Sequence, residues 1–165
     1  MGAFNSSSFI RTAVLTGSVG TVLIAAPFIG EWEQLRNIAY LDPVRIPTIC
    51  YGHTEGVKLG QTKTDEECAA LLVGELKEYM DAVDSLVKVP MPDTRRAAFV
   101  SFTYNVGITN FKNSTLLRKL NAGDTIGACN ELPRWVYAKG IKLKGLVRRR
   151  EAERELCLAG TGEEI

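Results

Sequence analysis

The segment from Glu33 to Thr54 reads EQLRNIAYLDPVRIPTICYGHT, with two acids and a hydroxyl at short fixed spacings. Eight residues separate Glu33 from Asp42, and Thr48 follows Asp42 by six positions. Cleavage of a glycosidic bond requires one carboxylic acid to protonate the leaving oxygen and a second carboxylate on the other face of the sugar. A helix through the glutamate, followed by a β-hairpin entered at the aspartate, would turn both carboxyl groups toward one groove.

The expected distance between these carboxyl groups depends on the reaction. In inverting enzymes they stand about 6.5 to 9.5 Å apart, which leaves room for a water that Asp42 and Thr48 would hold between them. Two acids at such a spacing are more often solvated surface charges. The pair alone therefore does not identify a site, and the residues around it carry the argument further.

Several strings around the two acids form a recognisable pattern. Residues 39–42, AYLD, and residues 48–54, TICYGHT, resemble the AYxD and TIGYGHT motifs that follow a glutamate in phage-type lysozymes, glycoside hydrolase family 24. Three later strings look like the second lobe of that family: YNVG at 104–107, FKNSTLL at 111–117 and PRWVY at 133–137. The resemblance covers about Glu31 to Leu158. With its apolar N-terminus, the chain most resembles the signal-anchor-release endolysins of lambdoid phages such as phage 21.

The resemblance implies an α+β fold that is mainly α, with a small β-hairpin lobe and a helical lobe joined by a long helix. It implies a muramidase that hydrolyses the β-1,4 bond between N-acetylmuramic acid and N-acetylglucosamine in peptidoglycan, for host cell lysis. Glu33 would be the general acid, Asp42 the carboxylate that positions or activates water, and Thr48 the third catalytic residue. Glu31 competes with Glu33, but its spacing to Asp42 is two residues too long. No cofactor and no metal are implied.

Two positions depart from the family pattern. The family usually has glycine after the catalytic glutamate and again in the hairpin, where this chain has Gln34 and Arg45. Glycine at such places often serves a positive φ that other residues resist. Substrate fit and activity are therefore less certain than the three catalytic residues imply.

Residues of the second lobe are candidates for contact with the glycan. Sugar rings have apolar faces edged by hydroxyls, so an aromatic surface beside an amide can bind them. Core packing is the commoner fate of Phe99, Phe102, Phe111 and Trp135. Tyr104, Asn105 and Tyr137 are the better candidates for the cleft, and the family resemblance implies that Asn105, Gly107, Ser114 and Thr115 contact the glycan.

Two other functions remain open. A lytic transglycosylase needs the acid but no carboxylate that holds water, and Asp42 and Thr48 argue against it. A catalytically silent protein that binds the wall or perturbs the membrane is compatible with Gln34 and Arg45.

Composition is consistent with one catalytic domain, because 165 residues that are 45% hydrophobic can bury a substantial core. The net charge of +1 hides a basic cluster between Lys139 and Arg154. Such a cluster attracts anionic polymers, of which peptidoglycan fits the catalytic residues better than nucleic acid does. Glu151, Glu153 and Glu155 interleave with the arginines, which favours a salt-bridged helix. We expect a monomer that does not bind nucleic acid.

The N-terminal residues determine the expected location. Arg11 precedes nineteen uncharged residues, Thr12 to Gly30, which can just span about 30 Å of hydrocarbon as a helix. A cleavable signal peptide is the alternative, but Pro27 after Ala26 disfavours cleavage there. Arg11 before the segment and two acids after it place the catalytic domain in the periplasm.

A leader held in the inner membrane would keep Glu33 at the bilayer surface and away from Asp42. The tethered enzyme would then be inactive. The resemblance to signal-anchor-release endolysins implies that release of the leader on depolarisation, caused indirectly by a holin or pinholin, activates it. The expected organisation is an N-terminal anchor over residues 1–30, a lysozyme domain over 31–160 and a tail over 161–165.

Four cysteines, Cys50, Cys68, Cys129 and Cys157, suit an oxidising compartment, and three pairings are possible. Cys129 with Cys157 is the pairing we expect, with Cys50 and Cys68 paired or reduced. Cys50 and His53 form a Cys-x-x-His without a second ligand pair, so a metal site is not expected. His53 is expected to hydrogen-bond to backbone.

The first expected elements are a short helix through Glu33 and a hairpin from Ile46 to Thr54 that extends to Leu59. Five further helices and a tail follow. Thr64 and Glu67 form a capping box that predicts a long helix to about Val87. The remaining helices are expected at 93–107, 114–121, 124–132 and 145–158, with a frayed tail from Gly160.

Overall fold

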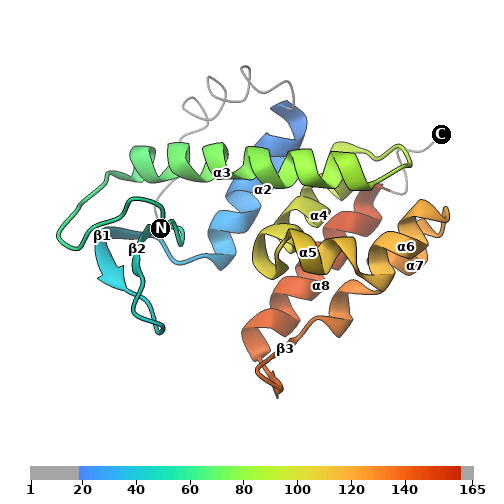
Figure 1. Cartoon of the computed structure of the whole chain (residues 1–165). Coiled ribbons are helices and arrows are strands. Elements are labelled where there is room, and N and C mark those ends of the chain that lie inside the picture. The colour runs from blue at the N-terminus through green and yellow to red at the C-terminus, as the bar shows by residue number, and fades with distance from the viewer. Residues whose placement is uncertain (1–18, 161–165) are drawn as a thin grey trace. The chain divides into compact units, whose positions relative to one another are not determined.

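The computed structural model describes residues 19–160 of the chain (Figure 1). These residues are mainly helical and include two antiparallel sheets of two strands each, which confirms the predicted fold class. The chain separates into two compact units, residues 1–77 and 78–165. The long helix α3, Asp65–Leu86, begins in the first unit and ends in the second.

The first described element is helix α2, Val19–Trp32, which contains the second half of the apolar leader. The leader residues 12–18 lie outside the described part of the chain. Along α2 the buried side chains are Thr21, Val22, Ala25, Ala26 and Ile29. Within residues 19–160, none of the helices combines the length and the apolar character needed to cross a bilayer.

The β-hairpin of the first unit pairs β1, Arg36–Leu41, with β2, Pro47–Cys50. The predicted hairpin from Ile46 to Thr54 was wrong in its pairing, because the partner of β2 precedes Asp42. Beyond Cys50, the predicted segment 46–59 has one bridge, between Ile49 and His53, and a second isolated bridge joins Ile38 of β1 to Thr62. Cys50 and Gly52 both have positive φ, so the chain turns there and does not continue as a strand.

Helix α3 begins at the predicted capping box. The Thr64 backbone N–H donates to Glu67 Oε2 over 2.8 Å, and the Glu67 N–H donates to Thr64 Oγ1 over 3.2 Å. Both bonds satisfy donors that a helix start leaves without partners. The predicted helix is confirmed, and it ends one residue before the expected Val87.

The second unit is built around helix α4, Asp93–Val106, whose residues 97–103 are all buried. Phe102 makes edge-to-face contacts with Phe111 and Trp135, at ring-centroid distances of 6.4 and 5.2 Å. The core role expected for these aromatic residues is confirmed. The other helices of this unit are α5 Ile108–Lys112, α6 Thr115–Asn121, α7 Thr125–Cys129, the 3-10 helix η1 Leu132–Arg134 and α8 Lys144–Ala159.

Three of these elements differ from the prediction. Helix α5 was not expected, and the helix predicted over residues 124–132 ends at Cys129 and is followed by η1. Pro133 explains the break, because it has no N–H to donate to the carbonyl four residues earlier, that of Cys129 at the end of α7. A short hairpin of β3, Tyr137–Ala138, and β4, Ile141–Lys142, was also missed.

Helix α8 is confirmed as a salt-bridged helix. Glu153 pairs with Arg149 and with Arg150, and Glu151 pairs with Arg154. The expected disulfide between Cys129 and Cys157 is present and joins α7 to α8. The tail residues 161–165 lie outside the described part of the chain.

Candidate active site

The three catalytic candidates belong to the first unit, where Asp42 begins the turn between β1 and β2. Asp42 Oδ1 accepts hydrogen bonds from the backbone N–H groups of Val44 and Ile46, over 2.9 and 2.8 Å. The Asp42 N–H donates to the Ile46 carbonyl over 3.0 Å. Asp at the first position and Pro43 at the second favour this turn. One carboxylate oxygen is thereby fixed, and the half-buried side chain has a second oxygen for other partners.

Thr48 is bonded to the same peptide. Its hydroxyl donates to the Ile46 carbonyl over 2.9 Å, and the side chain is buried. Thr48 also lies opposite Tyr40 in the register of the two strands. Since a hydroxyl has one hydrogen and two lone pairs, Thr48 Oγ1 can still accept a hydrogen bond. The structure therefore brings Asp42 and Thr48 together around Ile46.

Glu33 lies just beyond the end of α2, where its N–H donates to the Ile29 carbonyl over 3.0 Å. Its side chain is half-buried, whereas that of Glu31 is exposed. The helix therefore fixes the backbone of Glu33. Burial favours Glu33 over Glu31 as a site residue.

The two departures from the glycine pattern differ in their effect. Arg45 has a φ of 67°, whereas Gln34 is not among the residues of positive φ within positions 19–160. Arg45 follows Pro43 and Val44 in a three-residue loop, a type that ends with a residue in the left-handed region. The expected positive φ is confirmed at Arg45 and was wrong for Gln34, and the effect of either residue on substrate fit and activity stays a prediction.

Replacing Arg45 by glycine is expected to raise the free energy of unfolding by about 0.5–1 kcal/mol. Relief of a left-handed backbone is worth about 1–2 kcal/mol, and the greater freedom of unfolded glycine offsets part of it. Thermal unfolding of the parent and the Arg45→Gly variant measures the difference. The Arg45→Ala variant is the control, because alanine keeps the backbone penalty; an equal gain in both variants would contradict this account.

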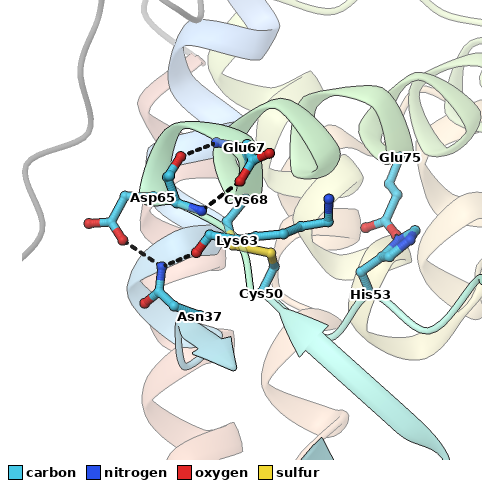
Figure 2. The surroundings of a disulfide bond; sticks show 9 residues. Asn37, Cys50, His53, Lys63, Asp65, Glu67, Cys68 and Glu75 are labelled. Carbon is cyan, nitrogen blue, oxygen red and sulfur yellow. Dashed lines mark hydrogen bonds and ion pairs between the residues drawn. A yellow bond between two sulfur atoms is a disulfide. The ribbon is translucent and has the colours of Figure 1, made fainter. Parts of the chain in front are cut away.

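Three contacts hold the hairpin lobe to the start of α3 (Figure 2). A disulfide joins Cys50 to Cys68, and His53 Nδ1 pairs with Glu75. The Asn37 side chain donates to the Lys63 carbonyl and to Asp65 Oδ1, over 2.9 and 2.8 Å. A two-stranded hairpin alone is marginally stable in water, so these contacts are needed to keep Asp42 and Thr48 in place.

One expectation is corrected here, and one alternative that the sequence left open is decided. The His53 ring pairs with Glu75 instead of backbone, although its backbone does pair with Ile49. Cys50 is oxidised and has a φ of 60°, a left-handed conformation for which the family motif has glycine. Beside it, burial and, to a lesser degree, Asp65 raise the pKa of Tyr51, so this phenol is not suited to act as a base.

Removal of the Cys50–Cys68 bond in a double serine variant is expected to lower the free energy of unfolding by about 3 kcal/mol. The two residues are 18 apart in sequence, and closing a loop of that size restricts the unfolded chain. Hydrogen exchange by mass spectrometry should show faster exchange in residues 36–50. The matched control removes Cys129 and Cys157, which should leave hairpin exchange unchanged; equal effects would show that the bond does not act on the hairpin.

The six glycan candidates belong to the second unit. Tyr104 packs edge-to-face on Tyr79, Gly107 has a φ of 89° between α4 and α5, and Asn105 Oδ1 accepts from Arg150. Ser114 is the buried N-cap of α6, where its hydroxyl donates to the Phe111 carbonyl and accepts from the Leu117 N–H. Thr115 accepts from Arg118, and Tyr137 is 62% exposed. Glycan contact remains a prediction for all six.

The ion pairs of α8 were expected, but the sequence reasoning missed that Arg150 and Glu153 are buried and that Arg150 reaches residues outside the helix. Arg150 donates to Glu153, to Asn105 and, over 3.1 Å, to the Trp135 carbonyl. Burial lowers the pKa of Arg150, and the Glu153 charge opposes that shift. The i,i+3 and i,i+4 spacings from Arg150 and Arg149 to Glu153 were the available signal. This network fixes the position of the Asn105 side chain.

Comparison with known proteins gives a consistent set of matches. The sequence model described as Phage lysozyme matches residues 30–153. The SAR-endolysin of Enterobacteria phage P21 is 46% identical over 145 residues, covering 87% of this chain and 88% of the relative. The muramidase domain of SpmX from Asticcacaulis excentricus has 34% identity and a TM-score of 0.77, over 81% of this chain and 94% of that one.

Two solved structures of one P1 phage endolysin, Lyz, differ in their likeness to this chain. The active form gives a TM-score of 0.82 at 29% identity and covers both chains completely. The secreted inactive form gives 0.51 at 28% identity and covers 67% of this chain and 79% of that one. The lysozyme-like fold is thereby confirmed.

Proposed function

This chain belongs to the phage lysozyme family, and we propose that Glu33, Asp42 and Thr48 carry out its reaction. It is an endolysin, a glycoside hydrolase that cleaves the β-1,4 bond after N-acetylmuramic acid in peptidoglycan and so lyses the host. The proposed catalytic domain covers residues 31–160.

The observation that carries the assignment is that Asp42 and Thr48 both hydrogen-bond to the backbone of Ile46. Two N–H groups fix Asp42 Oδ1, and the Thr48 hydroxyl donates to the Ile46 carbonyl. Asp42 Oδ2 and the lone pairs of Thr48 Oγ1 can then accept both hydrogens of one water. In the proposed inverting step Asp42 takes a proton from this water as it attacks the anomeric carbon.

Glu33 has the complementary role in this step. As the bond to the leaving sugar breaks, its carboxylic acid donates a proton to the departing oxygen, so that a neutral hydroxyl leaves. The proposed substrate contacts are Tyr104, Asn105, Gly107, Ser114, Thr115 and Tyr137. Arg150 supports this role for Asn105 because it holds the side chain in one orientation.

Product analysis tests this assignment. The purified full-length protein is incubated with Gram-negative peptidoglycan, and the soluble fragments are identified by mass spectrometry. Reducing-end muramic acid products are expected. Anhydromuramic products would instead mean a lytic transglycosylase, and an absence of fragments would mean a catalytically silent protein or an inhibited state.

We also propose that the leader tethers the enzyme to the inner membrane before lysis. The SAR-endolysin relatives and the apolar segment over residues 12–30 support this. In the structure Val19–Trp32 is a helix with five buried side chains, and the chain is more similar to the active than to the inactive P1 endolysin. A helix that is buried in the fold cannot at the same time lie in lipid. We therefore assign the described conformation to the released, periplasmic enzyme.

Cell fractionation tests the tether. In energised cells the protein should sediment with membranes and lack activity, and an uncoupler should move it to the periplasm in active form. A Thr16→Leu/Gly20→Leu variant should remain in the membrane, because leucine is favoured in lipid. Activity in energised membranes would contradict the proposal.

We further propose that the enzyme acts as a monomer and that a holin or pinholin releases it only by depolarising the membrane.

A further inference from the structure

The β3–β4 hairpin of the second unit combines exposed apolar side chains with unpaired positive charge. Every residue from 137 to 145 is exposed. The large apolar side chains that this hairpin and the start of α8 present to water are Tyr137 at 62%, Ile141 at 65%, Leu143 at 41% and Val147 at 38%. Scattered exposed apolar residues are ordinary, but four within eleven positions form a patch that requires an explanation.

The charged residues in and around this hairpin are all basic. Residues 132–150 contain seven arginines and lysines and no acid. Glu153 pairs with Arg149 and Arg150, and Glu131 pairs with Arg134. The remaining four, Lys139, Lys142, Lys144 and Arg148, are exposed, and within residues 19–160 no carboxylate forms an ion pair with them.

The geometry of the hairpin places apolar side chains and lysines together at its tip. Tyr137 pairs with Lys142, and Ala138 pairs with Ile141, so the two large apolar side chains lie on opposite faces. Lys139 and Gly140 form the turn, with φ of 49° and 76°. Such a turn favours asparagine or glycine at both positions, and a strained lysine there points to a functional role.

We propose that this hairpin, residues 137–144, docks on the surface of an anionic lipid bilayer. Interfacial elements place apolar side chains at the boundary of the acyl chains and keep lysine ammonium groups among the headgroups. Tyrosine is enriched at that depth, so Tyr137 has two proposed roles, one as a glycan contact and one at the bilayer surface, while the lysines and Ile141 belong to the bilayer surface alone. The hairpin has all three features, and its proposed role goes beyond hydrolysis of peptidoglycan.

Other occupants fit less well. Peptidoglycan carboxylates match the lysines, but sugar rings edged by hydroxyls would cover Ile141, Leu143 and Val147 less completely than acyl chains would. A second copy of the chain would bring four like charges against four others. An anionic bilayer offers negative charge and an apolar layer next to each other. The docked enzyme would remain near the inner membrane after its leader has left the lipid.

The test uses full-length protein with tryptophan placed at Ile141 or, as a matched control, at Ile126, which is 59% exposed on α7. Brominated lipids quench tryptophan that enters the bilayer, and native Trp32 and Trp135 contribute equally to both variants. With vesicles of phosphatidylethanolamine and phosphatidylglycerol, Ile141→Trp should be quenched and shifted to the blue, and Ile126→Trp should not.

Charge removal provides the second arm. A Lys139→Gln/Lys142→Gln/Lys144→Gln variant should weaken partitioning of the hairpin on the order of 100-fold, since each lysine near an anionic surface contributes about fivefold. A Lys58→Gln/Lys88→Gln/Lys112→Gln variant, also of exposed lysines, is the control. Hydrolysis of isolated peptidoglycan should be unchanged in both.

Three results would overturn the proposal. Equal quenching at positions 141 and 126 would attribute any vesicle binding to the leader. Equal quenching in phosphatidylcholine vesicles would remove the role of the lysines. Loss of peptidoglycan binding by the hairpin variant, without lipid quenching in the parent, would assign this surface to the glycan.

Discussion

The Glu33→Gln variant is expected to hydrolyse peptidoglycan about 10²- to 10⁴-fold more slowly than the parent, the range that one general acid contributes. Glutamine has nearly the shape of glutamate but has no proton to donate to the leaving oxygen. Because Glu33 lies beyond the last residue of α2 and is half-buried, the fold should tolerate the change. Initial rates of turbidity loss and fragment release measure the effect.

The Glu31→Gln variant is the matched control for this loss. Glu31 is exposed, lies two residues away and has the same chemistry, so its replacement should leave the rate within a few-fold of the parent. Circular dichroism and thermal unfolding of both variants exclude a folding defect. If Glu31→Gln were inactive and Glu33→Gln active, the acid would have been assigned to the wrong residue.

The Glu153→Gln variant is expected to lose about 3–5 kcal/mol of folding free energy, as when one partner of a buried ion pair is removed. The Glu153 side chain is fully buried, and so is that of Arg150. Glu153 Oε1 accepts from Arg149 Nε over 3.1 Å and from Ser101 Oγ over 2.7 Å, while Oε2 accepts from Arg150. Glutamine preserves the size but removes the negative charge to which Arg149 and Arg150 both donate.

Thermal unfolding should show this loss as a decrease of roughly 10 °C in Tm, since 1 kcal/mol corresponds to about 2–4 °C in a domain of this size. Glu155→Gln on the exposed face of α8 is the control and should change stability by less than about 0.5 kcal/mol. An Arg149→Met/Arg150→Met/Glu153→Leu variant should recover stability, because it removes the three buried charges of this network together. A Glu153→Gln protein as stable as the parent would show that the network is not needed for folding.

Local signals in the sequence predicted most of the helices correctly. The Thr64–Glu67 capping box and the apolar spacing after it determine α3, because both depend on residues only a few positions apart. The interleaved charges of α8 likewise predicted its ion pairs. Family resemblance located Asp42 and Thr48 in the hairpin, but their common partner, the Ile46 peptide, became visible only in the structure.

Contacts between distant residues were harder to predict. His53 and Glu75 are 22 positions apart, and nothing in either local sequence links them. The Cys50–Cys68 pairing was left open because four cysteines alone do not determine their partners. The strands β3 and β4 have two residues each, which is too short for an alternating pattern to be detected.

Helix α2 limits how the N-terminal sequence of this protein can evolve. Thr21, Ala25 and Ala26 have no exposed surface, so a larger side chain at these positions would overfill the interior. In the proposed tethered state the same positions contact lipid, where larger aliphatic residues would hold the segment more firmly. A mutation toward leucine would therefore delay lysis and destabilise the enzyme together, and one toward a charged residue would impair both export and folding. Release from the lipid of the tethered state and packing in the interior of the folded enzyme thus both favour small side chains at these positions. The timing of host lysis therefore depends on the packing of one helix.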